Sequence, residues 1–361
     1  MWLVVNAGSS SVKLVVFDAN LRDVARATVD RIGAGGPPTH AEAMAEGLGR
    51  MGLAPAALTA AAHRVVHGGV ALTAPQRVTP AVIAGIEACV PLAPLHNPGN
   101  LTGIRAVEAL VPGLPQYVSF DTAFHATNPD VATTYAIPAE ERARGLRRFG
   151  FHGLSYAALV RILRGRGALT RRMLAFHLGN GVSACAILDG ASVASSMGWS
   201  PVEGLTMGTR PGNLDPMVAL DLAERHGVDG ARALLNRRSG LLALGGHSDM
   251  RALHEAGTPE AAFAIDHFCY WAIRHAGSLI AAMGGVETIV FTGGIGENDF
   301  SVRGRILDGL SWAGVAYDAD ANRQNAGALH LAKSDVAIWT VPADEERQIA
   351  QEAQTVRECE G

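Results

Sequence analysis

The sequence predicts an α/β fold made of two domains that share one plan. Segments typical of short apolar strands alternate with segments typical of helices, a pattern that indicates α/β architecture with mixed sheets. A Gly-rich turn between two apolar strands occurs near the N-terminus and again near residue 180, and 361 residues suffice for two domains. Aligning Gly8 with Gly179 places Asp18 opposite Asp189, which is consistent with two related halves.

The expected elements follow one another along the whole chain. Residues 3–5 and 14–17 lack strict apolar/polar alternation, so they are predicted to be buried strands. The pairs Asp215-Pro216 and Thr258-Pro259 each combine a helix N-cap with proline at the first helical position. Further strands are predicted at residues 63–66, 116–120, 177–188 (a second hairpin), 288–292 and 336–341. Helices are predicted at residues 79–88, 99–110, 215–227, 258–283, from about 301 and at 344–357, and surface loops at 33–38 and 165–167.

Composition excludes several classes of protein. The net charge of −4 and the lack of a basic stripe argue against a nucleic-acid or membrane-surface protein. No segment approaches the roughly 18 consecutive apolar residues that span a bilayer. The N-terminus has no basic region or cleavage site before its Gly/Ser turn, so no signal peptide is predicted. We therefore expect a soluble cytoplasmic protein.

Cysteine and lysine usage add two smaller points. The cysteines lie far apart and form no CxxC pair, so buried free thiols are expected rather than a zinc site or a disulfide framework; they are Cys89, Cys185, Cys269 and Cys359. Only two of the 30 basic residues are lysines. One of them, Lys13, lies in the first Gly/Ser loop, which hints that a compact point charge is needed there.

Polar and glycine-rich clusters stand at predicted strand ends, where α/β proteins bind ligands. In the cluster from Asn6 to Lys13, glycine would let the backbone approach a phosphate while hydroxyl and amide groups donate to it. An ordinary hairpin turn explains this cluster equally well. In the cluster at residues 63–69, the Val-Val and Gly-Gly pairs argue against a metal site made by His63 and His67. Arg64 could clamp a carboxylate or phosphate, or it could be a solvated surface arginine.

Asp121 directly follows a predicted strand, a position suited to holding Mg²⁺ or handling a proton, although a helix cap is also possible. The remaining clusters lie at residues 91–98, 149–153, 207–212 and 293–298. The collected arginines, lysine, carboxylate, histidines and glycine-rich turns favour phosphoryl transfer. The chain has no GxSxG elbow, no GxGxxG after the first strand and no Walker A loop, which argues against a hydrolase with a Ser-His-Asp triad and a Rossmann dehydrogenase.

These segments resemble the acetate kinase family, to which propionate and butyrate kinases are close. Eight motifs stand in the family's order between residues 4 and 298, and VPADEE follows near the end; the eight are VVNAGSSSVKLVVFD, HRVVHGG, APLHNPGN, FDTAFH, RRFGFHG, FHLGNG, SPVEGLTMGTRPG and FTGGIGEN. The resemblance implies a duplicated actin-like (ribonuclease H-like) ATPase fold with two domains and a cleft between them. Residues 1–123 with 344–361 would form the acyl-substrate and magnesium side, and residues 124–343 the nucleotide-binding domain.

The resemblance also implies site residues. His152 and Arg210 would stabilise the transition state, and Asp121 would act as acid/base, through magnesium or by activating acetate. The implied magnesium residues are Asn6 and Glu345. The implied acyl-substrate residues are Arg64 and His96, with an apolar pocket of Val66, Leu95, Phe151 and Pro201. The implied ATP-binding residues are Ser9, Ser11, Lys13, His177, Leu178, Gly179, Asn180, Gly181, Asp249, Met250, Arg251, Gly294, Ile295, Gly296, Glu297 and Asn298.

The implied activity is reversible, magnesium-dependent, direct in-line phosphoryl transfer between ATP and acetate, giving ADP and acetyl phosphate. Mg²⁺ is the expected cofactor, with tolerance of Mn²⁺ left open, and a homodimer is implied. A propionate or butyrate kinase, or a non-transferring actin-like ATP-binding module, is the alternative. Valine at position 66 favours acetate over longer acids, by roughly 1–3 kcal/mol per methylene. The chain departs from the usual family residues at Val70, Tyr156, Trp199 and Met250. None of these departures removes a charged group that is proposed for the chemistry.

Overall fold

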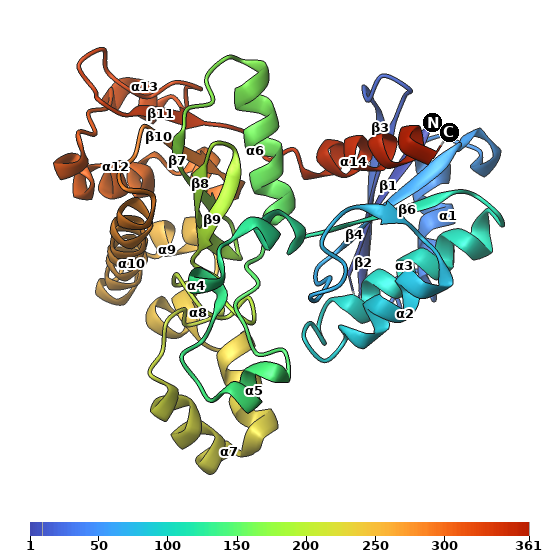
Figure 1. Ribbon diagram of the computed structural model, residues 1–361, viewed down its shortest axis with the longest axis horizontal. Coiled ribbons are helices and arrows are strands. Elements are labelled where there is room, and N and C mark those ends of the chain that lie inside the picture. Colours follow the sequence, from blue (N-terminus) through green and yellow to red (C-terminus); the bar gives the residue numbers. More distant parts are fainter. Residues whose placement is uncertain (9, 361) are drawn as a thin grey trace. The chain divides into compact units, whose positions relative to one another are not determined.

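The computed structural model describes residues 1–8 and 10–360, which form two compact units (Figure 1). Ser9, one of the expected ATP contacts, lies outside the described residues, as does Gly361. Unit 1 consists of Met1–Ala126, Gly153–Ala158 and Asp344–Gly361, and unit 2 consists of Thr127–His152 and Leu159–Ala343. Within the described residues, no helix has both the length and the apolar character needed to cross a membrane.

Unit 1 is built on a six-stranded sheet with the order β3-β2-β1-β4-β6-β5. The strands are β1 (Trp2–Ala7), β2 (Ser11–Phe17), β3 (Asp23–Asp30), β4 (Ala60–Val65), β5 (Gln76–Arg77) and β6 (Gln116–Phe120). β1, β2 and β3 pair in antiparallel fashion, whereas β1, β4 and β6 run parallel. The carboxyl ends of β1, β4 and β6 therefore lie at one edge of the sheet.

Helices cover both faces of this sheet (Figure 1). They are α1 (His40–Arg50), α2 (Pro80–Ala88), α3 (Asn97–Leu110) and α14 (Glu345–Glu360), with short 3₁₀ turns η1 (Pro55–Ala57) and η2 (Ala123–Thr127). Alternate residues of each strand point to opposite faces, which creates two apolar layers. Leu3 and Val5 of β1 pack with α1 and α3, and Trp2 and Val4 pack with α14.

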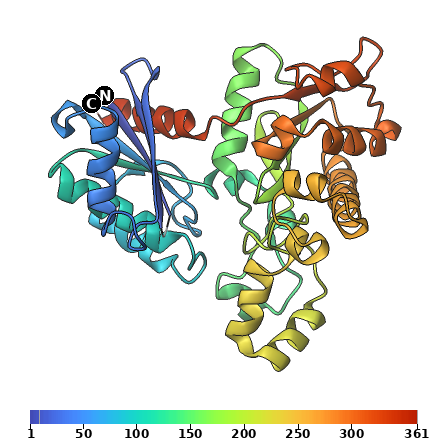
Figure 2. The same cartoon turned by 180° about the vertical axis from the view of Figure 1, so that it is seen from behind.

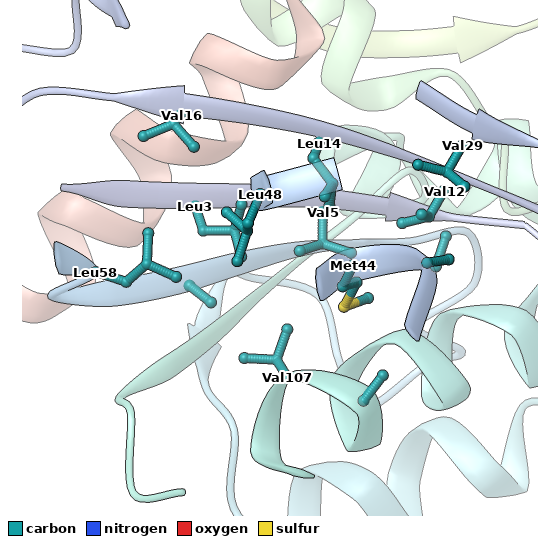
Figure 3. Close-up of a cluster of buried hydrophobic side chains, with 14 of the residues drawn as sticks. Leu3, Val5, Val12, Leu14, Val16, Val29, Met44, Leu48, Leu58 and Val107 are labelled. Carbon is teal, nitrogen blue, oxygen red and sulfur yellow. The ribbon is translucent and has the colours of Figure 1, made fainter. Parts of the chain in front are cut away.

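Figure 3 shows the first of these layers, in which β-branched and leucine side chains from three strands meet Met44 and Leu48 of α1 and Val107 of α3. All of these side chains are almost fully buried. α1 begins with a capping box, since Thr39 accepts from the Glu42 amide and the Glu42 side chain accepts from the Thr39 amide. This packing fixes the strands whose ends carry the polar clusters.

Unit 2 contains a five-stranded sheet with the order β11-β10-β7-β8-β9. Its strands are β7 (Arg172–Leu178), β8 (Val182–Leu188), β9 (Ala191–Ser195), β10 (Thr288–Thr292) and β11 (Ala337–Thr340). α10 packs against β8 and β9. Figure 2 shows the fold from behind. The helices are α4 (Asp130–Thr133), α5 (Ala139–Ala143), α6 (Gly153–Gly165, which begins in unit 1), α7 (Pro216–Arg237), α8 (Gly240–Gly245), α9 (Met250–Ala256), α10 (Pro259–Met283), α11 (Gly293–Asn298), α12 (Phe300–Gly309) and α13 (Ala319–Arg323), with a 3₁₀ turn η3 (Ser311–Ala313).

The two sheets share one topology. The order β3-β2-β1-β4-β6 of unit 1 corresponds to β9-β8-β7-β10-β11 of unit 2, with two antiparallel pairs followed by two parallel pairs in each. Gly8 and Gly179 each directly follow the first strand of a hairpin, and Asp18 and Asp189 each directly follow the second. The duplicated actin-like α/β fold is confirmed.

Several elements differ from the sequence-based expectation. The patterns did not predict β3, β9, α1 or α6, and α6 extends to Gly165 in the segment expected to be a loop. Gly227 has φ 70° and interrupts α7 where the helix was expected to end, but helical structure resumes beyond it to Arg237. β4 begins at Ala60 and ends at Val65, so Val66 lies just past the strand. Three cysteines are buried as free thiols, whereas Cys359 is exposed on α14, contrary to expectation.

Two buried histidines of unit 1 give its stability a pH dependence. Burial lowers the pKa of His63 to about 4, and burial likewise lowers the pKa of His67 to about 4. Because the pKa is lower in the folded protein than the value of 6.5 in the unfolded chain, the neutral histidine contributes its full stability at pH values above 6.5. This contribution is lost as the pH falls from 6.5 towards 4, because in this range the unfolded chain binds the proton and the folded protein does not. We expect His63 to contribute on the order of 3 kcal/mol to this loss.

Urea unfolding at several pH values between about 7.5 and 4.5 measures this effect. His63 Nε2 lies 2.8 Å from Gln116 Oε1, and Gln116 Nε2 donates to Glu108, so His63 is the donor. His63→Asn retains a donor without a titrating ring, and the variant should lose less stability than the wild type as the pH falls. Parallel pH curves for the two proteins would contradict this assignment.

Candidate functional site

A cavity of about 260 Å³ lies in unit 1 at the carboxyl ends of β1 and β4. This is the edge at which parallel strands of α/β sheets place ligands. It gathers six of the residues implied by the resemblance, with four others; the lining is Asn6, Ala7, Gly8, Ser11, Lys13, Thr28, Arg64, Val66, His96 and Asn100. Leu95 is not in the lining, and its side chain is exposed.

Arg64 and Asp121 form an ion pair beside this cavity. Arg64 Nη2 donates to Asp121 Oδ2 at 2.6 Å and Nε donates to Oδ1 at 3.1 Å, so one edge of the guanidinium grips the carboxylate. Asp121 is 1% exposed and Arg64 is partly buried. The alternative of a solvated surface arginine is therefore wrong. Arg64 Nη1 makes no hydrogen bond within the described part of the chain.

Burial and charge act in opposite directions on this pair. Burial raises the pKa of Asp121 above its usual range, and the charge and hydrogen bonds of Arg64 oppose that rise. Burial tends to lower the pKa of Arg64, but the charges of Asp121 and Glu345 outweigh it and leave the pKa above its ordinary value. Arg64 therefore remains a cation at the cavity at all physiological pH values.

Two further acidic residues of α14 face the same region. Glu345 is half-buried and interacts electrostatically with both Arg64 and Asp121, while Glu346 forms an ion pair with Lys13. Mg²⁺ in kinases is held by one or two carboxylates together with substrate phosphates and waters. Asn6 and Glu345 offer an amide oxygen and a carboxylate, a donor set of the hard type that this ion prefers. The residues present thus fit a magnesium ion that arrives with a nucleotide.

Unit 2 contains a larger pocket of about 830 Å³ formed by three segments distant in sequence. Gly179 and Asn180 come from the turn after β7, Asp249 caps α9, and Gly294 opens α11. The lining combines backbone turns, polar side chains and the apolar side chains of Met250, Ile295 and Phe300. Eight residues of the implied ATP-binding set are brought together here: Gly179, Asn180, Asp249, Met250, Arg251, Gly294, Ile295 and Asn298.

Other residues of that set do not line the pocket. Leu178 and Gly296 are buried, His177 lies near the end of β7, and Gly181 lies in the turn that follows this strand. Glu297 Oε1 accepts from the amides of Gly293 and Ala343, so this carboxylate braces the start of α11. The segment expected to be a turn at residues 293–298 is a short helix, and the Glu297 carboxylate occupies the amide of its first residue, Gly293.

His152 and Arg210 meet at the turn after β7. His152 Nδ1 lies 2.8 Å from Ser183 Oγ, and its ring stacks on His177 with centroids 4.2 Å apart. A Cβ atom placed on Gly181 would lie 3.1 Å from His152 Nε2 and 3.9 Å from Arg210 Nη1. Glycine at this position therefore leaves a space that both side chains border.

Arg210 is held without a counter-charge. Its Nη1 donates to the Pro201 carbonyl at 3.2 Å, and burial lowers the pKa of the guanidinium below its ordinary value. No carboxylate of the described residues forms an ion pair with Arg210. A partly desolvated cation of this kind is well suited to interact with a phosphoryl group. Phe151 is buried directly before His152, whose φ of 57° places it in the left-handed region.

Sequence reasoning missed several residues at these sites. Asn100 lines the unit 1 cavity, Glu346 pairs with Lys13, and Ser183 contacts His152. His254 Nε2 lies 2.9 Å from Asp299 Oδ2 at the unit 2 pocket. Asn100 is the last residue of the motif APLHNPGN, so the motif itself was a signal, but the partner of a small polar side chain cannot be deduced from its spacing.

Comparison with known proteins supports one relationship throughout the chain. The family model described as the Acetokinase family matches residues 40–351. The acetate kinase of Methylocella silvestris is 47% identical over 320 residues, which covers 87% of this chain and 79% of that protein. The crystal structure of Porphyromonas gingivalis acetate kinase has a TM-score of 0.91 and 36% identity, covering 99% of both chains. A propionate kinase from Francisella tularensis has a TM-score of 0.93 and 31% identity, covering 98% of this chain and 99% of that one.

Proposed function

The chain belongs to the acetokinase family, and on this premise we propose that it is an acetate kinase, a phosphotransferase with a carboxyl group as acceptor. In the proposed reaction a carboxylate oxygen of acetate attacks the γ-phosphorus of MgATP. The bond from this phosphorus to the bridging oxygen of ADP breaks, and acetyl phosphate and ADP leave. The reverse reaction uses the same groups.

In this proposal the residues of unit 1 act on the carboxylate. Arg64 orients acetate through the part of its guanidinium that Asp121 does not occupy, and His96 and Val66 border the same cavity. Lys13 and Ser11 donate to phosphate oxygens from the hairpin turn. Asn6 and Glu345 would hold Mg²⁺, which supplies charge neutralisation to the β- and γ-phosphates when bound. Asp121 acts either as acid/base or through the metal.

The residues of unit 2 act on the nucleotide and on the transferred group. The end of β7 with its following turn (residues 177–181), the segment 249–251 and the short helix at 294–298 would bind ATP in the 830 Å³ pocket. His152 and Arg210 would donate to the equatorial oxygens of the migrating phosphoryl group, where negative charge is spread in the transition state. Phe151 and Pro201 would supply the remaining apolar contacts to the acyl group.

One observation carries the proposal. His152 Nε2 and Arg210 Nη1 border the same space above Gly181, next to the pocket that gathers the ATP-binding residues. A non-transferring ATP-binding module would have no use for this pair of donors in addition to the Arg64–Asp121 pair. The arrangement therefore favours transfer over simple binding.

A hydroxamate-coupled assay tests the proposal and separates the acyl substrates. The purified protein, MgATP and acetate, propionate or butyrate are incubated with hydroxylamine, which traps any acyl phosphate. We expect the highest kcat/KM with acetate. A higher kcat/KM with propionate or butyrate than with acetate would identify the protein as a propionate or butyrate kinase. If no acid gives an acyl hydroxamate, the kinase assignment is overturned.

Val66 should limit the length of the acyl chain. Val66 is 7% exposed at the cavity, and Val66→Ala removes its two γ-methyl groups, which opens space for the additional methylene of propionate. We expect the ratio of kcat/KM for propionate to that for acetate to rise by about tenfold. Val70→Ala is the matched control, because Val70 is 63% exposed and should leave the ratio unchanged. An unchanged ratio in Val66→Ala would remove Val66 from the acyl pocket.

We also propose that the protein is a cytoplasmic homodimer formed through unit 2. α10 exposes Phe263 and Tyr270, which are seven residues apart and so share one helix face, and α7 exposes Met217 and Leu220. Exposed large apolar side chains in such numbers are typical of protein interfaces. The four free cysteines are consistent with a reducing compartment.

Sedimentation velocity measures the oligomeric state directly. The wild type should sediment as a dimer, and Tyr270→Glu should shift it towards the monomer because it places a charge in the apolar face. Val131→Glu, at an exposed apolar position on α4, is the control and should not alter the distribution. A monomeric wild type at micromolar concentration would contradict the proposal.

A further inference from the structure

β1 and β4 are parallel neighbours whose pairing ends just before the unit 1 cavity. The last paired residues are Val5 and His63. Continued by two residues, this register would pair Ala7 with Val65 and direct the Ala7 carbonyl to the amide of Val66, as in any parallel ladder. The next ladder bond would therefore join Ala7 O to Val66 N.

The side chain of Asn100 stands in place of that bond. Asn100 Nδ2 donates to Ala7 O at 2.8 Å, and Asn100 Oδ1 accepts from Val66 N at 3.1 Å. The orientation of the carboxamide is unambiguous, because a carbonyl can only accept and an amide can only donate. The side chain thus mimics a peptide group inserted between the two strands.

The inserted amide is buried and rigidly held. Asn100 is 3% exposed on the first turns of α3, and neighbouring Asn97 binds both the amide and the carbonyl of His67, at 3.1 and 3.0 Å. α3 also lies very close to β1, since a Cβ atom on Gly103 would be 2.7 Å from the Ala7 Cβ. Asn100 therefore cannot retreat from its position between the strands.

The position of this amide coincides with the cavity. Ala7, Val66 and Asn100 all line the cavity. Asn6, which directly precedes Ala7 in the sequence, and Arg64, which lies two residues before Val66, line it as well. Were the ladder to close by one more bond, the ends of β1 and β4 would approach each other and the space between Asn6 and Arg64 would shrink. The amide acts as a spacer at the base of the cavity.

We propose that Asn100 is a positioning residue that holds the ends of β1 and β4 apart and so sets the distance between the magnesium-side Asn6 and the carboxylate-side Arg64. The proposal rests on the function proposed above for the roles of those two residues. It assigns to Asn100 no contact with the reacting atoms. A helix tether with no role in the reaction is the alternative.

Asn100→Ala tests the spacer directly. With the carboxamide gone, Ala7 O and Val66 N should bond to each other, which a crystal structure of the variant would show as an N···O distance near 2.9 Å. We expect kcat/KM for acetate to fall by about 100-fold, the loss that a displacement of about 1 Å of positioned groups produces. ATP binding, measured by calorimetry, should change much less than kcat/KM for acetate, since the pocket that gathers eight of the implied ATP-binding residues is formed by unit 2.

Asn100→Asp provides a second test that does not depend on the alanine variant folding. A protonated aspartic acid can donate to Ala7 O and accept from Val66 N, whereas the ionised form cannot donate. The activity of this variant relative to the wild type should therefore rise as the pH is lowered from about 8 to 5.5, because burial raises the pKa of a carboxyl group above about 4. A helix tether without a role in the reaction predicts a relative activity that does not depend on pH.

The outcomes separate the two proposals. Thr102→Ala, on the exposed face of α3, is the matched control and should retain wild-type kinetics. If β1 and β4 stay apart in Asn100→Ala, or if Asn100→Asp shows no pH-dependent recovery, the spacer role is overturned. If the strands close and kcat/KM for acetate is unchanged, this cavity is not where acetate is positioned, and the proposed function of the unit 1 residues fails.

Discussion

Replacement of Arg210 by alanine is expected to lower kcat by about 10²–10³-fold, the loss typical of removing one preorganised donor to a developing charge. Arg210 is partly desolvated, has no carboxylate partner among the described residues and borders the space above Gly181. Its charge is therefore available to a transferred phosphoryl group. The KM for ATP should change by much less, because the pocket lining does not include this residue.

Steady-state kinetics in the direction of acetyl phosphate formation check this prediction, with ATP binding measured separately by calorimetry. Arg232→Ala is a suitable control, since Arg232 is an exposed arginine of α7 in the same unit and pairs with Asp229 on its own helix. Arg210→Lys should restore part of the lost rate, because lysine keeps the charge but not the planar fork. Wild-type turnover in Arg210→Ala would contradict the role given to Arg210.

Replacement of Asp121 also has a large expected effect, and it acts on both stability and rate. Asp121→Ala leaves the Arg64 guanidinium beside the cavity without its carboxylate, and removing one partner of a buried ion pair costs about 3–5 kcal/mol. Asp121→Asn keeps an acceptor for Arg64 and should be destabilised less. Urea unfolding of the two variants and the wild type measures the difference.

The rate of Asp121→Asn also distinguishes the two roles left open for this carboxylate. We expect kcat to fall by about 10²–10⁴-fold in either case. If Asp121 acts through Mg²⁺, a higher magnesium concentration should recover part of the loss. If it handles a proton, the pH–rate profile should lose one limb and magnesium should have no effect. Wild-type kcat in Asp121→Asn would exclude both roles.

The hairpins show why part of the fold was predictable. Buried strands such as residues 3–5 consist of consecutive apolar residues, and the turns after them contain glycine, so both hairpins could be located from local pattern. β3 could not be located, because Asp23–Asp30 pairs with β2 alone among the described strands and is largely exposed, so its sequence lacks an apolar run. Its existence depends on the hairpin that it extends.

The candidate site, like the fold, was predictable only in part. The motifs identified Arg64 and Asp121 as candidates, but not that they bind each other across 57 positions of sequence. The position of Asn100 between Ala7 and Val66 depends on how closely α3 packs on β1, and no local pattern encodes that distance. Side chains whose partners are distant backbone atoms are therefore found only once the packing is known.

In the proposed reaction, a carboxylate oxygen of acetate attacks the γ-phosphorus of ATP directly. The most direct measurement of this step uses acetate labelled with ¹⁸O in both oxygens, MgATP and the purified protein, with the products followed by ³¹P NMR. Direct attack predicts an acetyl phosphate resonance with the isotope shift of ¹⁸O bonded to phosphorus, in step with ADP formation. Release of ADP and inorganic phosphate without acetyl phosphate, or an acetyl phosphate signal without the shift, would contradict it.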